Sequence, residues 1–108
     1  MLVDTHSHLY EESFLPDWDE VVLRCKEAGV KKILLPNVDS LTLVALKNTV
    51  EKNPDLFLPM MGLHPCSVKV NYKEELIKIK EILFNGKYIA VGEIGIDLYW
   101  DKTLLKEQ

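Results

Sequence analysis

Four short apolar runs along the chain predict β-strands. They comprise residues 2–6, 32–36, 56–62 and 88–94. Each run is apolar almost throughout rather than alternating with polar residues, which is typical of strands covered on both faces in a parallel sheet. The third run is the weakest of the four, because Pro59 has no backbone N–H to donate to a neighbouring strand.

Helical periodicity fills the intervals between the first three runs, with apolar residues three and four positions apart. A first helix is expected to begin near Pro16 and to stop at Gly29. A second helix is expected to follow a cap at Asp39 or Ser40 and to end at Asn53, which precedes a proline. These two segments predict that each strand is followed by a helix.

Two more helices are expected in the second half of the chain. The third covers residues 73–84 and is closed by an Asn-Gly pair. Residues 101–103 look like the cap of a fourth helix, and residues 104–108 would be its first turn. The resulting order, β-α-β-α-β-α-β, predicts an α/β fold with a parallel sheet and right-handed crossovers.

Length and composition are those of one globular domain over residues 1–108. Hydrophobic residues make up 47% and charged residues 28% of the 108 positions. No apolar run approaches the roughly 20 residues that span a bilayer, and the amino terminus lacks the features of a signal peptide. We therefore expect no membrane association. The two cysteines, Cys25 and Cys66, lie far apart and are read as free thiols of a reducing compartment, which predicts a cytoplasmic location.

The net charge of −4 gives no overall attraction to DNA or to anionic lipid. A phosphate substrate is nevertheless not excluded, because a bound metal ion reverses the sign of the local charge. Other common chemistries are excluded by their missing motifs. The chain has no GxSxG, no P-loop and no GxGxxG, and Cys66 has no activating context.

The first candidate site residues follow the first strand, in the sequence Asp4-Thr5-His6-Ser7-His8. Alternate residues of an extended chain point to the same side, so His6 and His8 can converge on one ion. Neutral imidazole is a common ligand of zinc and other transition metals. Asp4 has the same parity and could orient a histidine. The competing interpretation is a pair of surface histidines.

The other candidates also follow strands. Glu93 ends the fourth apolar run, where an unpaired carboxylate is costly, and a metal ion or an ion pair would explain it. The third histidine, His64, follows the third run. In parallel α/β folds, sites are built at the carboxyl edge of the sheet. The shared placement of these residues predicts a site at that edge more strongly than any one of them does.

The three motifs together resemble the TatD-type metal-dependent deoxyribonucleases of the amidohydrolase-like superfamily. The matching segments are VDTHSHL at 3–9, GLHP at 62–65 and GEIGID at 92–97. Members of that family are TIM barrels of about 250 residues. The resemblance therefore implies that these 108 residues correspond to the first half of a (β/α)8 barrel and that the chain is truncated.

The resemblance also implies roles for individual residues. His6 and His8 match the family's first pair of metal ligands, and Glu93 matches the carboxylate that joins the two metal positions. His64 matches an active-site histidine that contacts the substrate or its phosphate, and Asp97 matches an acidic residue near the site. The family's remaining ligands, two histidines and an aspartate, belong to later strands. The family often has Asp after HxHL, where this chain has Tyr10.

The function implied is metal-assisted hydrolysis of DNA phosphodiester bonds with divalent ions, Mg, Zn or Mn, two of them in a complete enzyme. One alternative is an amidohydrolase acting on an amide or ester. Another is a catalytically inactive fragment, and we expect the isolated 108-residue chain to have little or no activity. We also expect the fragment to self-associate, because inward side chains of an open half-barrel would face water, such as Val3, Leu35, Met61 and Val91 or their neighbours along each strand.

Overall fold

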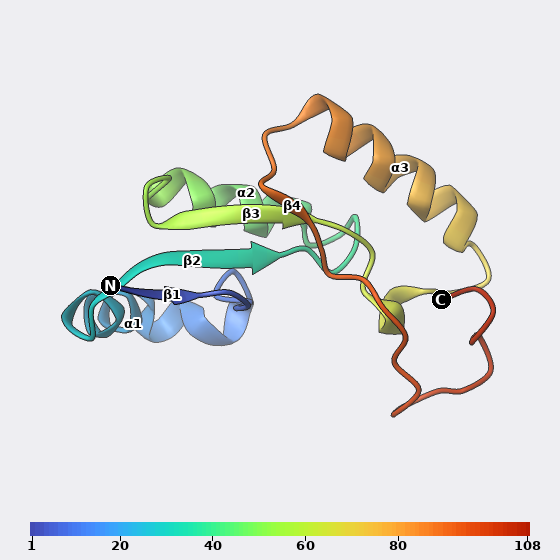
Figure 1. The fold of residues 1–108 in the computed structure, drawn as a ribbon, viewed down its shortest axis with the longest axis horizontal. Coiled ribbons are helices and arrows are strands. Elements are labelled where there is room, and N and C mark those ends of the chain that lie inside the picture. The colour runs from blue at the N-terminus through green and yellow to red at the C-terminus, as the bar shows by residue number, and fades with distance from the viewer.

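A computed structural model describes all residues from 1 to 108. It contains one four-stranded parallel sheet in the order β1-β2-β3-β4, so that each strand pairs with its neighbours in the sequence. The strands are β1 (Leu2–Asp4), β2 (Val30–Pro36), β3 (Phe57–Met61) and β4 (Ala90–Val91). Figure 1 shows their common direction. The predicted parallel α/β order is confirmed.

Helices connect the strands, and their bounds agree closely with the sequence pattern. They are η1 (Glu12–Asp17), α1 (Trp18–Glu27), α2 (Leu43–Lys52), η2 (Pro65–Ser67) and α3 (Tyr72–Asn85). The first predicted helix is divided at Asp17 into a 3-10 segment and an α-helix. Gly29 reverses the chain after α1 with a φ of 82°, a backbone conformation that residues other than glycine rarely adopt. No helix is both long enough and apolar enough to cross a membrane.

The predicted fourth helix is absent. Residues 103–107 form a turn, and the predicted cap is present in part, because the Asp101 carboxylate accepts hydrogen bonds from the backbone N–H and the hydroxyl of Thr103. The backbone N–H groups of Glu107 and Gln108 both donate to Leu104, which makes a single turn. Such a short segment gains too few hydrogen bonds to offset the cost of helix nucleation.

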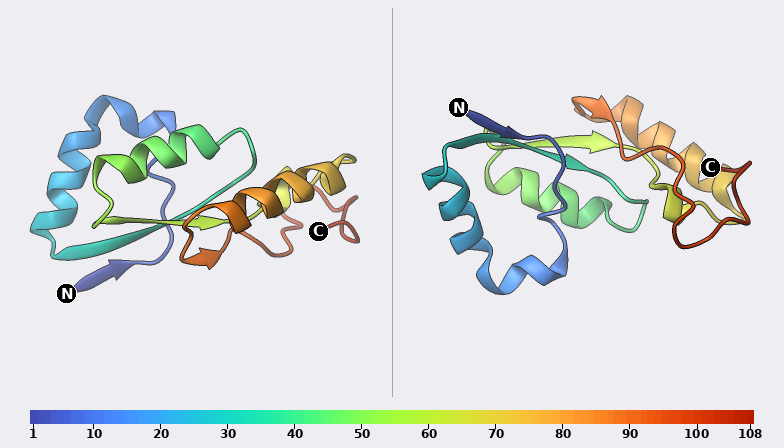
Figure 2. Two further views of the ribbon diagram at one scale, coloured as in Figure 1. Left: turned by 90° about the horizontal axis from the view of Figure 1, so that it is seen from above. Right: turned by 60° about the horizontal axis from the view of Figure 1, so that its bottom comes forward.

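The hydrophobic core lies between the sheet and the helices on one of its faces. Helices α1 and α2 cover the same face (Figure 2). Ile33, Phe57 and Leu46 are completely buried there, and the ring of Phe57 lies 5.7 Å from that of Trp18 in α1, centroid to centroid. The core therefore fixes β2 and β3 as the rigid centre of the sheet.

Which side chains face the open side of the sheet was predicted only in part. The expectation named Leu35 and Met61 or their strand neighbours, and Leu35 and Met61 themselves are completely buried. Their strand neighbours Leu34 and Met60 are partly exposed instead. Side chains alternate between the two faces of a strand, so an error of one residue in register exchanges the faces. Exposure of the other two expected residues is confirmed, at 45% for Val3 and 55% for Val91.

The last strand is short because its chain soon leaves β3. Only Ala90 and Val91 pair with β3, although the apolar run predicts a strand over 88–94. The Gly92 N–H still donates to Met61 at 3.0 Å, but the next N–H, that of Glu93, donates to the carbonyl of Asn37 at 3.1 Å. This crossing carries Glu93 over the end of β3 toward the end of β2.

Candidate metal centre and active site

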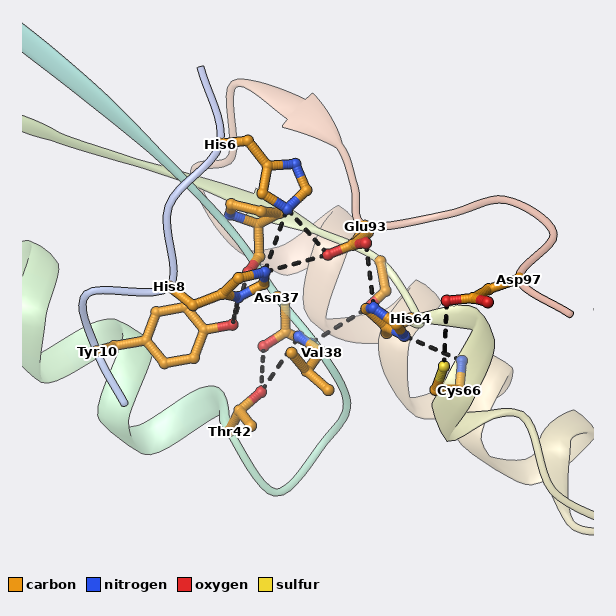
Figure 3. Close-up of polar contacts among 12 residues, drawn as sticks. His6, His8, Tyr10, Asn37, Val38, Thr42, His64, Cys66, Glu93 and Asp97 are labelled. Atoms are coloured by element: carbon orange, nitrogen blue, oxygen red, sulfur yellow. Dashed lines mark hydrogen bonds and ion pairs between the residues drawn. The ribbon is translucent and has the colours of Figure 1, made fainter. Parts of the chain in front are cut away.

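The carboxyl ends of all four strands meet at one edge of the sheet, and polar residues gather there. His6 and His8 follow β1, Asn37 follows β2, His64 follows β3 and Glu93 follows β4. Figure 3 shows the side chains of His6, His8, His64 and Glu93 pointing toward one another, whereas that of Asn37 points toward Thr42. The backbone N–H of the intervening Ser7 donates to Leu34 at 3.0 Å and so prolongs the pairing of β1 with β2. The extended chain therefore turns both histidines to the same side, as their parity predicts.

Three side-chain atoms form a nearly equilateral triangle. The Nε2 atoms of His6 and His8 lie 3.2 Å apart, and they lie 3.1 Å and 3.2 Å from Oε2 of Glu93. The predicted convergence of these three tips is therefore present. His6 is the most accessible, with 52% of its side chain exposed, against 23% for His8 and 22% for Glu93. The triangle is thus open to solvent on the His6 side.

The other oxygen of the same carboxylate contacts the third histidine. Nε2 of His64 lies 3.1 Å from Oε1 of Glu93. Nδ1 of His64 accepts a hydrogen bond of 2.9 Å from the backbone N–H of Cys66. A backbone N–H can only donate, so Nδ1 carries no hydrogen and a neutral His64 holds its hydrogen on Nε2. His64 therefore donates to Glu93, and Glu93 bridges this donor and the triangle.

Asn37 holds the ends of three strands together. It is completely buried. Its backbone N–H lies 3.2 Å from the carbonyl oxygen of Met60 and 3.3 Å from that of Gly92, and its carbonyl accepts from Glu93. Its side chain donates to the carbonyl oxygens of Asp39 and Gly62 and accepts from the hydroxyl of Thr42. Both hydrogens and the oxygen of the buried side-chain amide thus have hydrogen-bond partners, and the backbone of Glu93 is bonded to the residue that follows β2.

The two acidic residues predicted near the site lie outside the triangle. The Asp4 carboxylate accepts a hydrogen bond of 3.1 Å from the backbone N–H of His6, so it orders the backbone of the loop rather than an imidazole ring. Asp97 lies beyond His64, where its carboxylate contacts Sγ of Cys66 at 3.5 Å. Burial, followed by this hydrogen bond to Asp97, raises the pKa of the Cys66 thiol, which keeps it protonated and poorly nucleophilic.

Sequence reasoning missed the structural importance of two residues, Tyr10 and Asn37. The hydroxyl of Tyr10 lies 2.8 Å from Nδ1 of His8 and donates to the carbonyl oxygen of Pro36 at 2.6 Å. Burial, with smaller contributions from Glu11 and Glu93, raises the pKa of Tyr10 above its ordinary value, so the phenol stays neutral. The available signal for Tyr10 was its parity with His6 and His8. For Asn37 it was a polar residue directly after a buried strand.

The triangle has the composition and size of a metal site. Two imidazole nitrogens and a carboxylate oxygen form a donor set that zinc and other divalent transition metals accept. The circumradius of a triangle with these edges is about 1.8 Å, slightly below the zinc–ligand distance of about 2.0–2.1 Å. One ion can therefore lie within bonding distance of all three atoms. His6, His8 and Glu93 could hold a metal ion as they stand.

Comparison with known families decides the assignment. The family model described as TatD related DNase matches residues 3–108. The chain belongs to the TatD-related DNase family. The match includes every residue of the site, from His6 to Glu93, and the resemblance noted in the three sequence motifs is confirmed.

Known relatives of the TatD family align with almost the whole chain. The metal-dependent hydrolase YabD of Bacillus subtilis (strain 168) is 35% identical over 103 residues, which are 95% of this chain and 40% of YabD. The 3'-5' ssDNA/RNA exonuclease TatD of Erwinia tasmaniensis is 25% identical over 96 residues, which are 89% of this chain and 37% of that protein. The chain thus spans about two fifths of the length of these relatives.

A solved structure of the TatD family has the same fold. The crystal structure of YjjV, a TatD homologue from Escherichia coli K12, matches with a TM-score of 0.82 and 28% sequence identity. The match covers 97% of this chain and 41% of YjjV. The predicted fold class is confirmed, and the three βα units with the fourth strand are the first half of a TIM (β/α)8 barrel.

Proposed function

We propose that this chain is the amino-terminal part of a metal-dependent nuclease that hydrolyses DNA phosphodiester bonds. The observation that carries the proposal is the triangle of His6, His8 and Glu93, with the donor His64 beside it at the carboxyl edge of the sheet. Membership of the TatD-related DNase family supports DNA as the substrate. A relative named as a 3'-5' ssDNA/RNA exonuclease supports a nucleic acid in general.

Each residue has a distinct role in this proposal. His6, His8 and Glu93 would hold a divalent ion, which when bound lowers the pKa of a bound water and offsets charge on the phosphoryl oxygens. A neutral His64 has its hydrogen on Nε2, 3.1 Å from Glu93, and it would donate this hydrogen to a phosphate oxygen in place of Glu93 when substrate binds. Asp4 orders the loop that carries His6. Asp97 contacts Sγ of Cys66, the residue whose backbone N–H donates to His64, and its carboxylate also accepts from the backbone N–H of Tyr99.

The donor set also ranks the metals. Two imidazole nitrogens favour a transition metal, whereas Mg²⁺ prefers oxygen ligands. The expected order of affinity for this site is therefore zinc above manganese above magnesium. The family resemblance implies that the other ligands, and a second metal, depend on later strands. We therefore propose that the 108 residues bind one ion and have little or no nuclease activity alone. The two free cysteines support a cytoplasmic location.

Metal binding is tested by calorimetric titration of the protein with ZnCl₂, MnCl₂ and MgCl₂. His6→Ala and Glu93→Gln should each weaken zinc binding by at least about tenfold, because each removes one of the three ligand atoms. Glu20→Gln is the matched control, since Glu20 lies on the exposed surface of α1 with 76% of its side chain accessible. Equal zinc affinity in all four proteins would contradict the proposed site.

The substrate class is tested in a chimera in which this chain replaces the matching part of YabD. Single-stranded DNA, a simple phosphodiester, an amide and an ester would be offered as substrates with zinc and with manganese. Hydrolysis of DNA that is lost in the His6→Ala chimera is expected. Hydrolysis of only the amide or ester would favour the amidohydrolase alternative, and rapid DNA digestion by the 108 residues alone would show that later strands are dispensable.

A further inference from the structure

Tyr10 lies beneath the metal triangle and contacts one of its histidines. Only 4% of its surface is exposed. Its hydroxyl oxygen lies 2.6 Å from the carbonyl oxygen of Pro36, the last residue of β2, and 2.8 Å from Nδ1 of His8. Figure 3 shows the ring reaching His8 from the side opposite Glu93. The hydroxyl thus connects His8 to the backbone of the central sheet.

The single hydrogen of this hydroxyl determines the protonation pattern of His8. The Pro36 carbonyl can only accept, so the tyrosine hydrogen is used in that short bond. The hydroxyl oxygen must then accept in its contact with His8, and Nδ1 of His8 must carry a hydrogen. In a neutral imidazole with its hydrogen on Nδ1, Nε2 presents a lone pair. That lone pair points into the triangle, 3.2 Å from Glu93.

His64 is held in the opposite tautomer. Its Nδ1 accepts from the Cys66 N–H, so its hydrogen is on Nε2. The fold thus gives two neighbouring histidines different chemical properties, a ligand at His8 and a donor at His64. In both cases a backbone group sets the tautomer. The Pro36 carbonyl acts on His8 through the Tyr10 hydroxyl, and the Cys66 N–H acts on His64 directly.

We propose that Tyr10 is a positioning residue that fixes His8 in the Nδ1–H tautomer and so presents Nε2 to a divalent cation. The proposal rests on the metal site proposed above. Without the hydroxyl, a neutral His8 could place its hydrogen on Nε2, where it blocks the cation. Loss of the hydrogen-bond partner of a metal-binding histidine weakens metal binding by about 10- to 100-fold. Zinc affinity should fall by that factor in Tyr10→Phe, which retains the buried ring.

The tautomer itself is measured by ¹⁵N NMR of the histidine rings in the metal-free protein at a pH where they are neutral. His8 should show a protonated Nδ1 and an unprotonated Nε2, and His64 should show the reverse. In Tyr10→Phe the His8 pattern should shift toward the other tautomer, while His64 stays unchanged. A wild-type His8 protonated on Nε2 would overturn the proposal without any variant.

Zinc titration completes the test, with Tyr88→Phe as the matched control. Tyr88 is a partly buried tyrosine that precedes β4, at the opposite end of the strand from the site. Weaker zinc binding in Tyr10→Phe alone supports the proposal, and equal affinity in all three proteins overturns it. If wild-type protein binds no zinc, the metal site is wrong, and this proposal falls with it even where the NMR pattern shows the inferred His8 tautomer.

Discussion

Replacing Gly62 by alanine places a methyl group against the backbone that carries Glu93. An alanine Cβ at this position would lie 2.6 Å from the carbonyl oxygen of Glu93 and 2.7 Å from the carbonyl carbon of Gly92. Ordinary van der Waals contact begins at 3.4 Å. The obstructing atoms belong to the main chain, so no rotamer change can relieve the overlap. The φ angle of Gly62 is not positive, so the effect of the substitution is purely steric.

The geometry sets the size of the expected effect. To relieve the overlap, the 92–93 backbone must move away by about 0.8 Å, whereas metal–ligand distances tolerate deviations of about 0.2 Å. Because Oε2 of Glu93 lies 3.1–3.2 Å from the two histidine nitrogens, such a shift separates the carboxylate from the other ligands. We expect zinc affinity to fall by about tenfold or more. Overpacking should also destabilise the fold by about 1–3 kcal/mol.

Calorimetric zinc titration and urea unfolding measure the two effects separately. Gly86→Ala is the matched control. Gly86 follows the last residue of α3, and its added methyl meets mainly the ring of Tyr88, a side chain that can move. This control should leave zinc affinity unchanged. The reasoning is refuted if Gly62→Ala binds zinc as the wild type does and unfolds at the same urea concentration.

Two further predictions concern stability and assembly. Ser40→Ala removes the 3.0 Å hydrogen bond from Ser40 to Glu75, which links the loop before α2 to α3, and should cost about 1 kcal/mol in urea unfolding at pH 7. Hydrogen bonds from Lys78, and then from Ser40, lower the pKa of Glu75 in the folded protein. The stabilisation is therefore complete above the pKa of the unfolded chain, about 4.3, and is lost as the pH falls through the pKa of the folded protein. The cost of Ser40→Ala should therefore shrink below about pH 4. In sedimentation, the unpaired edges at β1 and β4 and exposed side chains such as Val3 and Val91 should produce dimers or larger assemblies, and a compact monomer at high concentration would contradict this.

The sequence predicted those features that depend on local periodicity. The parallel order follows from alternating apolar runs and amphipathic segments, and the shared edge follows from the position of each polar residue after a strand. The parity of His6 and His8 correctly predicts that both rings face the same side, because Ser7 continues the pairing with β2 beyond the assigned strand.

Other features depend on contacts between distant segments, which one sequence does not reveal. The sequence left open whether Leu35 or its neighbour Leu34 faces the open side of the sheet, because an apolar run without alternation contains no register information. The fourth strand is shorter than its apolar run because Glu93 bonds to Asn37, which lies 56 positions earlier in the chain. The role of Tyr10 depends on its hydrogen bond to the backbone carbonyl of Pro36. Every residue has a backbone carbonyl, so the residue type at position 36 does not indicate this bond.

The Asn37 network also affects how much disorder the site loses when a ligand arrives. Because this buried residue binds the backbones of Met60, Gly92 and Glu93 and the carbonyl of Gly62, these segments become ordered during folding. Fixing a residue's backbone costs about 1–2 kcal/mol of conformational entropy. An incoming cation therefore meets a largely immobile frame, and the entropy that remains to be lost belongs chiefly to the half-exposed ring of His6. Cation affinity at this edge therefore depends on Asn37, although Asn37 is not one of the three ligands.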